Sequence, residues 1–124
     1  MVWKRQKGCE KMLCSGEKVT YEVQEDALLV RVRGEIDHHS AVLVRTGIDN
    51  EILAKRPNRV LLELSAVDFM DSSGLGLIMG RYALVKQYGG TLTVLNPSPA
   101  VIKIMKLAGM EKMIPIKQTK EKKS

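Results

Sequence analysis

The chain has 124 residues, of which 44% are hydrophobic and 4% aromatic, with a formal net charge of +6. This length suits one domain with a buried core, the apolar content excludes a disordered chain, and the few aromatic residues disfavour a surface for stacking nucleic-acid bases. The positive charge belongs to the two ends, because residues 19–116 carry eleven basic and eleven acidic side chains, so no direct nucleic-acid contact is expected.

Residues 1–18 are predicted to form a flexible basic extension. Cys9 and Cys14 lie in it without a secretion signal, so we expect reduced thiols and a cytoplasmic protein. A structural zinc needs four ligands, and the sequence adds only the neighbouring histidines His38 and His39. No apolar run approaches the roughly 20 residues of a membrane helix. We therefore predict neither a metal site nor a membrane span.

Alternating apolar residues predict strands, and apolar residues three or four positions apart predict helices. The predicted strands are 20–24, 28–32, 59–64, 91–95 and an edge strand at 113–116. Three helices are predicted. The first is capped by Ser40 and buries Ala41, Val44, Ile48 and Ile52. The second spans 75–88 with Leu75, Ile78, Tyr82 and Val85 on one face, and the third begins near Pro99 with Val101, Ile102, Met105 and Leu107 on its apolar side.

The order β-β-α-β-α-β-α-β predicts an α/β fold in one domain at 19–116. We expect a mixed β-sheet of about five short strands, with the helices packed against it. The segment 34–40 is predicted to be a loop. Residues 117–124 are predicted to form a lysine-rich tail.

The segment Asp68 to Gly76, Asp-Phe-Met-Asp-Ser-Ser-Gly-Leu-Gly, carries two hydroxyls at a predicted strand-to-helix turn. Unpaired N–H groups and the positive end of a helix dipole lie at such a position. Four interpretations fit Ser72 and Ser73: part of a dinucleotide cradle, a hydrolase nucleophile, a helix cap, or a hydroxyl that accepts a phosphate.

Two of these interpretations lack parts of their usual patterns. Gly74, Gly76 and Gly80 give G-x-G-x-x-x-G, but a dinucleotide site also needs an acid about 20 residues later, and none occurs between residues 86 and 110. The hydrolase motif G-x-S-x-G is absent. A histidine of the 34–40 loop could serve as a base only if that loop folded against the turn.

The other two interpretations place no further demand on the sequence. In a purely structural role, Ser72 caps the helix and Ser73 continues it. As a phosphate acceptor, the turn would gain about −1.5 to −2 charges. The helix N-terminus favours that charge, whereas Asp68 and Asp71 oppose it. Like charges brought together at an interface cost several kcal/mol, so one phosphate could switch binding off.

Four motifs together resemble anti-sigma factor antagonists of the STAS domain family, most closely the sporulation type that frees sigma-F. They are Gly34-Glu35-Ile36-Asp37-His38-His39, Phe69-Met70-Asp71-Ser72-Ser73-Gly74-Leu75-Gly76, Gly80-Arg81-Tyr82 and Asn96-Pro97-Ser98-Pro99-Ala100-Val101. The resemblance covers about residues 19–116. It implies a non-enzymatic regulator with no cofactor of its own.

The resemblance also implies a partner-switching mechanism. The unphosphorylated antagonist binds an anti-sigma factor that is also a serine kinase, and this binding releases the sigma factor. The kinase then uses its own ATP to phosphorylate the antagonist, which loses affinity, and a serine phosphatase resets the cycle. The alternative is a nucleotide- or ligand-binding STAS scaffold of a stress-signalling complex.

Individual residues take roles through the same resemblance. Ser73 is the implied phosphorylation site, with Ser72 capping or positioning the turn. Asp37 is the implied contact to a basic group on the kinase, and Asp71 orients the turn. Gly74 and Gly76 keep the start of the helix open for the partner.

Overall fold

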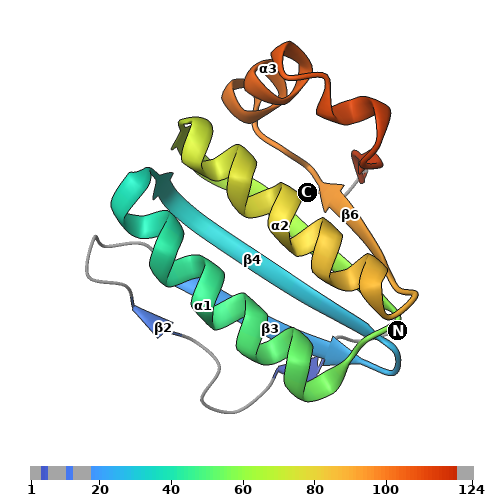
Figure 1. Ribbon diagram of the computed structural model, residues 1–124. Helices are drawn as coiled ribbons and strands as arrows, with labels where there is room; N and C mark the ends of the chain where they lie inside the picture. Colours follow the sequence, from blue (N-terminus) through green and yellow to red (C-terminus); the bar gives the residue numbers. More distant parts are fainter. Residues whose placement is uncertain (1–3, 6–10, 13–17, 120–124) are drawn as a thin grey trace.

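The computed structural model describes residues 4–5, 11–12 and 18–119 (Figure 1). Its elements in chain order are β1 Lys4–Arg5, β2 Lys11–Met12, β3 Lys18–Gln24, β4 Ala27–Ile36, α1 His38–Lys55, β5 Arg59–Met70, α2 Ser72–Gln87, β6 Thr91–Leu95, α3 Pro99–Leu107, the 3₁₀ helix η1 Met110–Lys112 and β7 Ile116–Lys117. From β3 to β7 this is the predicted order β-β-α-β-α-β-α-β, and the α/β fold is confirmed.

The strands form one mixed sheet in the order β1-β3-β4-β5-β6-β7, with β2 also paired to β3. The hairpin strands β3 and β4 are antiparallel, whereas β4, β5, β6 and β7 are parallel neighbours. The two short strands β1 and β2 pair antiparallel with β3. The rest of the predicted extension at 1–18, like residues 120–124, lies outside the described residues.

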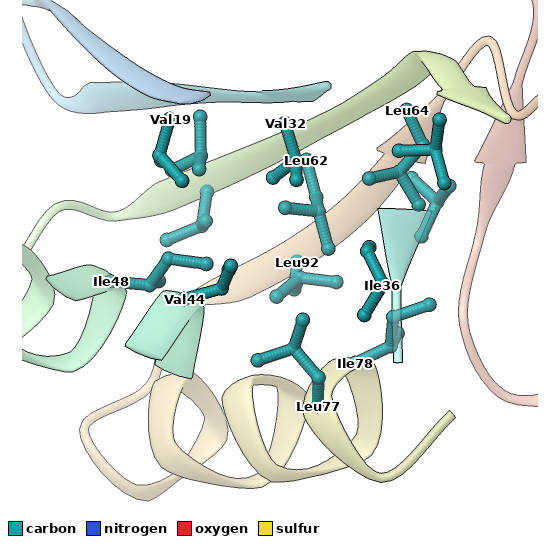
Figure 2. Close-up of a cluster of buried hydrophobic side chains, with 14 of the residues drawn as sticks. Val19, Val32, Ile36, Val44, Ile48, Leu62, Leu64, Leu77, Ile78 and Leu92 are labelled. Carbon is teal, nitrogen blue, oxygen red and sulfur yellow. The ribbon is translucent and has the colours of Figure 1, made fainter. Parts of the chain in front are cut away.

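Helices α1 and α2 lie side by side over one face of the sheet, whereas α3 packs against β5 near the end of the sheet (Figure 1). The core fills the space between the helices and the strands. Figure 2 shows sheet residues such as Val32, Leu62 and Leu92 facing Val44 and Leu77 of the two helices. All four apolar residues predicted for the buried face of α1 are buried.

Strand β5 is longer than predicted: it continues past Leu64 to Met70, and its pairing with β4 has two shifts in register. Its partners on β4 shift between Arg31 and Arg33, and again between Gly34 and Glu35. Each shift adds one residue to β5, as a β-bulge does. The buried positions of β5 accordingly change from a spacing of two residues to a spacing of three, at Leu64, Val67 and Met70.

The C-terminal part departs from the prediction in two places. Leu107 is 81% exposed, so its predicted place on the apolar side of the third helix is wrong; Val101 and Met105 of that helix are buried. The predicted edge strand is two residues long and begins at Ile116, after the turn of η1. The ordered chain continues beyond it, since the N–H of Thr119 donates to Asn96 Oδ1 at 2.7 Å.

A charged pair joins the two helices that cover the sheet. Arg81 Nε of α2 lies 2.7 Å from Asp49 Oδ1 of α1, and Arg81 Nη1 donates to the carbonyl of Leu77 at 3.2 Å. Burial lowers the pKa of the Arg81 guanidinium, and the nearby Asp49 carboxylate partly offsets that effect. The Asp49 carboxylate therefore supplies a counter-charge to a cation that is almost completely removed from water.

We expect Asp49→Asn to destabilise the fold, because it leaves the Arg81 guanidinium buried without its counter-charge. The expected loss in the free energy of unfolding is about 2 kcal/mol. This is less than for a fully buried pair, since the Asp49 side chain is 28% exposed. Urea unfolding measures the loss.

Asp26→Asn is the matched control, because it removes the Arg59–Asp26 pair, in which Arg59 Nη2 lies 3.5 Å from Asp26 Oδ1. The two side chains are 57% and 48% exposed, so the loss of this pair should cost about 0.5 kcal/mol or less. Equal losses for the two variants would contradict the role assigned to Asp49.

Candidate functional site

The carboxyl ends of β4 and β5 meet at one edge of the sheet, and both covering helices begin there. Ile36, the last residue of β4, pairs with Met70, the last residue of β5. The N–H of Asp71 donates to the carbonyl of Ile36 at 3.2 Å. Asp37 and Asp71 each follow one of these paired residues, so the two strand-to-helix turns are neighbours.

Asp37 caps helix α1. Its Oδ1 accepts hydrogen bonds from the N–H groups of His39 and Ser40, each at 3.0 Å, and the Ser40 hydroxyl accepts from the N–H of Asp37 at 2.9 Å. This reciprocal arrangement is a capping box. Two predictions are therefore wrong: Ser40 is the third helical residue rather than the cap, and the predicted 34–40 loop is the end of β4 followed directly by α1.

The same contacts stabilise the ionised form of Asp37. Its pKa lies below the ordinary value of 3.8, chiefly because the backbone N–H of Ser40 donates to the carboxylate. Desolvation acts in the opposite direction, while the Ser40 hydroxyl, the N–H of His39 and the charge of His39 add to the lowering. Asp37, for which the resemblance implies a contact with the partner kinase, thus also stabilises the start of α1.

Asp71 caps helix α2. Its Oδ1 accepts the N–H of Ser73 at 2.8 Å, and its carbonyl accepts the N–H of Gly74 at 2.9 Å. Ser72 is the first helical residue and is exposed. The interpretation of Ser72 as the cap is therefore wrong, whereas Asp71 does orient the turn. Neither serine hydroxyl is needed to close the helix end.

The two glycines after the serines differ in their surroundings. Gly74 is buried, and a Cβ at this position would run into the side chain of Met70 and touch that of Ile36. Gly76 is exposed, and a Cβ there would meet nothing within 4 Å. Gly74 therefore allows α2 to approach the sheet closely, and Gly76 leaves the outer surface of the helix open.

Ser73 lies half-buried at a groove of about 310 Å³ between α1 and α2. The groove is lined by His38, Ala41, Val42, Arg45, Ser73, Gly76, Leu77, Gly80 and Arg81. Ser73 is thus reachable from outside and is not sealed among aliphatic side chains. Val42, which borders the same groove, is 47% exposed and adds an apolar contact surface.

The structure brings Asp71, Ser73 and Gly76 to one end of α2, with Asp37 at the adjacent end of α1. Arg45 and Arg81 also line the groove. Sequence reasoning gave neither of them a role, although Arg81 belongs to the Gly80-Arg81-Tyr82 motif. Arg81 lies on the buried face of α2, where an arginine needs a paired acid, and this place, together with Asp49 in the preceding helix, was a further available signal.

The other chemical interpretations gain little from the structure. His38 borders the groove with Ser73, but within the described residues no hydrogen bond joins the Ser73 hydroxyl to either histidine, and no third residue completes a triad. In the described ranges, no three His, Cys, Asp or Glu side chains gather as a metal site, and no helix is long and apolar enough to cross a membrane. Cys9 and Cys14 lie outside the described residues.

Comparison with known proteins gives a consistent result. The family model described as STAS domain matches residues 18–123. The anti-sigma F factor antagonist of Paenibacillus polymyxa is 38% identical over 99 residues, which are 80% of this chain and 85% of that protein.

Solved structures of an anti-sigma factor antagonist also match the fold. The unphosphorylated anti-sigma factor antagonist SpoIIAA has a TM-score of 0.72 at 29% identity, with coverage of 83% of this chain and 89% of that one. The Bacillus cell fate determinant SpoIIAA in its phosphorylated form has a TM-score of 0.67, also at 29% identity, with coverage of 83% and 92%.

The cap at Asp37 predicts a pH-dependent contribution to stability. Because the pKa of Asp37 is lower in the folded chain than its ordinary value of 3.8, the ionised carboxylate stabilises the fold above that pH. The contribution is lost as the pH falls through the lower folded-state pKa. We expect Asp37→Asn to lower the melting temperature slightly at pH 7, and this difference should close below pH 3.8.

Asp37→Ala is the companion variant, because it removes the capping oxygen as well as the charge. Asparagine is a good N-cap and alanine is a poor one, so Asp37→Ala should have the lower melting temperature of the two at pH 7. Thermal unfolding followed by circular dichroism between pH 3 and pH 7 tests both statements. A gap between the parent and Asp37→Asn that widens in acid would show that the carboxylate is not stabilised as described.

Proposed function

The chain belongs to the STAS domain family as an anti-sigma factor antagonist, and we propose that phosphorylation of Ser73 controls its binding to an anti-sigma factor that is also a serine kinase. The relatives are regulatory binding proteins rather than enzymes, and so is this chain. In the proposal, the unphosphorylated form binds the anti-sigma factor and thereby releases a sigma factor. The phosphorylated form does not bind.

The position of the Ser73 hydroxyl carries this proposal. Ser73 borders an open groove at the start of α2, while Asp71 supplies the cap that holds the helix end. A kinase can therefore reach the hydroxyl without unfolding the turn. In the transfer, the Ser73 oxygen forms a bond to the γ-phosphorus of ATP as the bond to the ADP oxygen breaks, and the hydroxyl proton is lost to the kinase or to water.

The consequence of the transfer is electrostatic. The phosphoryl group brings about −1.5 to −2 charges to a surface that lies beside Asp71 and Asp37. A partner that presents acidic groups or a closely packed apolar surface at this point would lose affinity, and each 1.4 kcal/mol corresponds to about a tenfold change. One modification could then separate the two proteins without any change of fold.

The remaining parts of the cycle follow from this role. A serine phosphatase would return the antagonist to its binding form. The ATP belongs to the kinase, and we propose no cofactor on this chain. A mechanism that draws on ATP and controls a sigma factor would operate in the cytoplasm, and the antagonist would act through protein contacts rather than by touching nucleic acid.

We expect Ser73→Ala to bind the anti-sigma kinase persistently and to accept no phosphate. Ser73→Asp should bind at least tenfold more weakly than the parent chain, because it introduces a charge at the same place. Incubation with the kinase and ATP, followed by mass spectrometry and by titration calorimetry of the complex, measures both properties.

Ser72→Ala is the matched control, since it removes the neighbouring exposed hydroxyl. It should still be phosphorylated and should bind like the parent chain. Phosphate on Ser72 in the parent chain, or an unchanged phosphate yield in Ser73→Ala, would show that the site is assigned wrongly.

A second expected outcome concerns Asp37 as a contact to a basic group on the kinase. Asp37→Asn keeps a capping oxygen but removes the charge, so it should weaken docking by about tenfold while α1 stays intact. Glu111→Gln, at an exposed residue of η1, removes the same charge elsewhere and should leave docking unchanged. Equal affinities for Asp37→Asn and the parent chain would limit Asp37 to its capping role.

A further inference from the structure

The groove between α1 and α2 exists because α2 presents small residues along one side. Ser73, Gly76 and Gly80 are three and four positions apart and therefore follow one another along a helix face. A Cβ at Gly76 or at Gly80 would meet nothing within 4 Å. The two glycines thus leave an open channel that starts at Ser73 and runs along the helix.

The ionisable side chains that line this channel are all bases. They are His38 and Arg45 from α1 and Arg81 from α2, and no Asp or Glu lines the groove. Arg81 is 7% exposed and is engaged by Asp49 and by the Leu77 carbonyl. Arg45 is exposed and has no ion pair within the described part of the chain.

The two arginines lie close enough to affect each other. After burial and the opposing effect of Asp49, the positive charge of Arg45 further lowers the pKa of Arg81. Asp49 pairs with Arg81 but does not line the groove. A negative group that entered beside Ser73 would therefore relieve a repulsion that already exists in the unmodified chain.

We propose that this groove is a receiving site for the phosphoryl group of phosphorylated Ser73, which Arg45 holds with His38 as a second donor. The inference rests on the proposed function, because it assumes that Ser73 is the modified residue. The groove offers about 310 Å³, and on the same measure one water molecule needs only about 10–15 Å³, so a phosphoryl group and its waters fit. Arginine suits the role because its guanidinium donates two parallel hydrogen bonds to phosphate oxygens.

The receiving site gives phosphorylation two effects in place of one. The new charge opposes an acidic or apolar partner surface, and the captured Arg45 is withdrawn from any contact with that partner. The neighbouring carboxylates act against capture: Asp71 accepts the Ser73 N–H at 2.8 Å, and Asp37 caps the adjacent helix. The N-terminus of α2 and the three bases of the groove act in its favour.

The test uses the full chain with phosphoserine installed at position 73 during translation, so that no kinase is needed. Phosphorus NMR follows the second pKa of the phosphoserine, which is about 6 in the absence of structure. We expect a value below 6 in the parent chain, because adjacent cations favour the dianion. Arg45→Gln should raise this pKa by about half a unit or more, and Arg45→Lys should restore most of the lowering.

Arg33→Gln is the control for the loss of one positive charge. Arg33 is exposed and borders a separate hollow with Arg31 and Glu63, away from the helices. It should leave the phosphoserine pKa unchanged. If Arg45→Gln and Arg33→Gln give the same pKa as the parent chain, the phosphoryl group is not held in the groove and the inference is overturned.

A second measurement needs no variant. The chain with phosphoserine at position 73 should melt at a higher temperature than the unphosphorylated chain, and a lower melting temperature would contradict capture. If either result contradicts capture in the groove, the proposed function is still tested separately by phosphorylation with the kinase. Conversely, a kinase that modifies another residue would overturn the proposed function even if the installed phosphate is held in the groove.

Discussion

The pairing of Ile36 with Met70 at the carboxyl ends of β4 and β5 is the constraint on which the rest of the site depends. Parallel neighbours end at the same edge of a sheet, and α/β proteins commonly place their sites at that edge. Here each strand passes through a single aspartate into a helix, and the N–H of Asp71 is tied to the carbonyl of Ile36. The two helix starts are thereby fixed beside each other.

This arrangement explains how a small chemical change could act without rearranging the fold. The helices are held against each other by the Asp49–Arg81 pair and against the sheet by a continuous apolar core. The groove between them is therefore a fixed feature, bordered by Ser73 at one end and open along the glycines of α2. A phosphoryl group entering such a site changes charge and access, while the core beneath stays the same.

The sequence predicted the order of the elements because hydrophobic periodicity and turn residues act locally. The buried stripe of α1 from Ala41 to Ile52 follows from spacing alone. The two bulges of β5 do not, because they depend on pairing with β4, which brings Arg33 opposite Ala66. The helix caps were predicted at Ser40 and Ser72. Each turn contains more than one Ser or Asp that could serve as the cap, and only the place where the preceding strand ends decides which residue begins the helix.

The site was predicted from its motif but not from its surroundings. The serines and glycines lie together in the sequence, whereas Arg45 and Arg81 reach the groove from positions 28 residues before and eight residues after Ser73. Their proximity results from the packing of α1 against α2, which no local pattern encodes. Leu107 is a second case in which a local pattern is not enough. Its spacing placed it in an apolar helical stripe, yet its side chain is exposed.

At the start of α2 the cap is Asp71, so the hydroxyl of Ser73 is not needed to hold the helix end. If Ser73 or Ser72 were the cap, its oxygen would be engaged by backbone N–H groups, and esterification would weaken the helix end. Asp71 takes that task, with its carboxylate 2.8 Å from the Ser73 nitrogen. The cap places a negative charge close to the hydroxyl, and this charge opposes a phosphate. The bases on the facing wall of the groove supply the compensating charge, so a helix start capped by an acid can still accommodate a second anion.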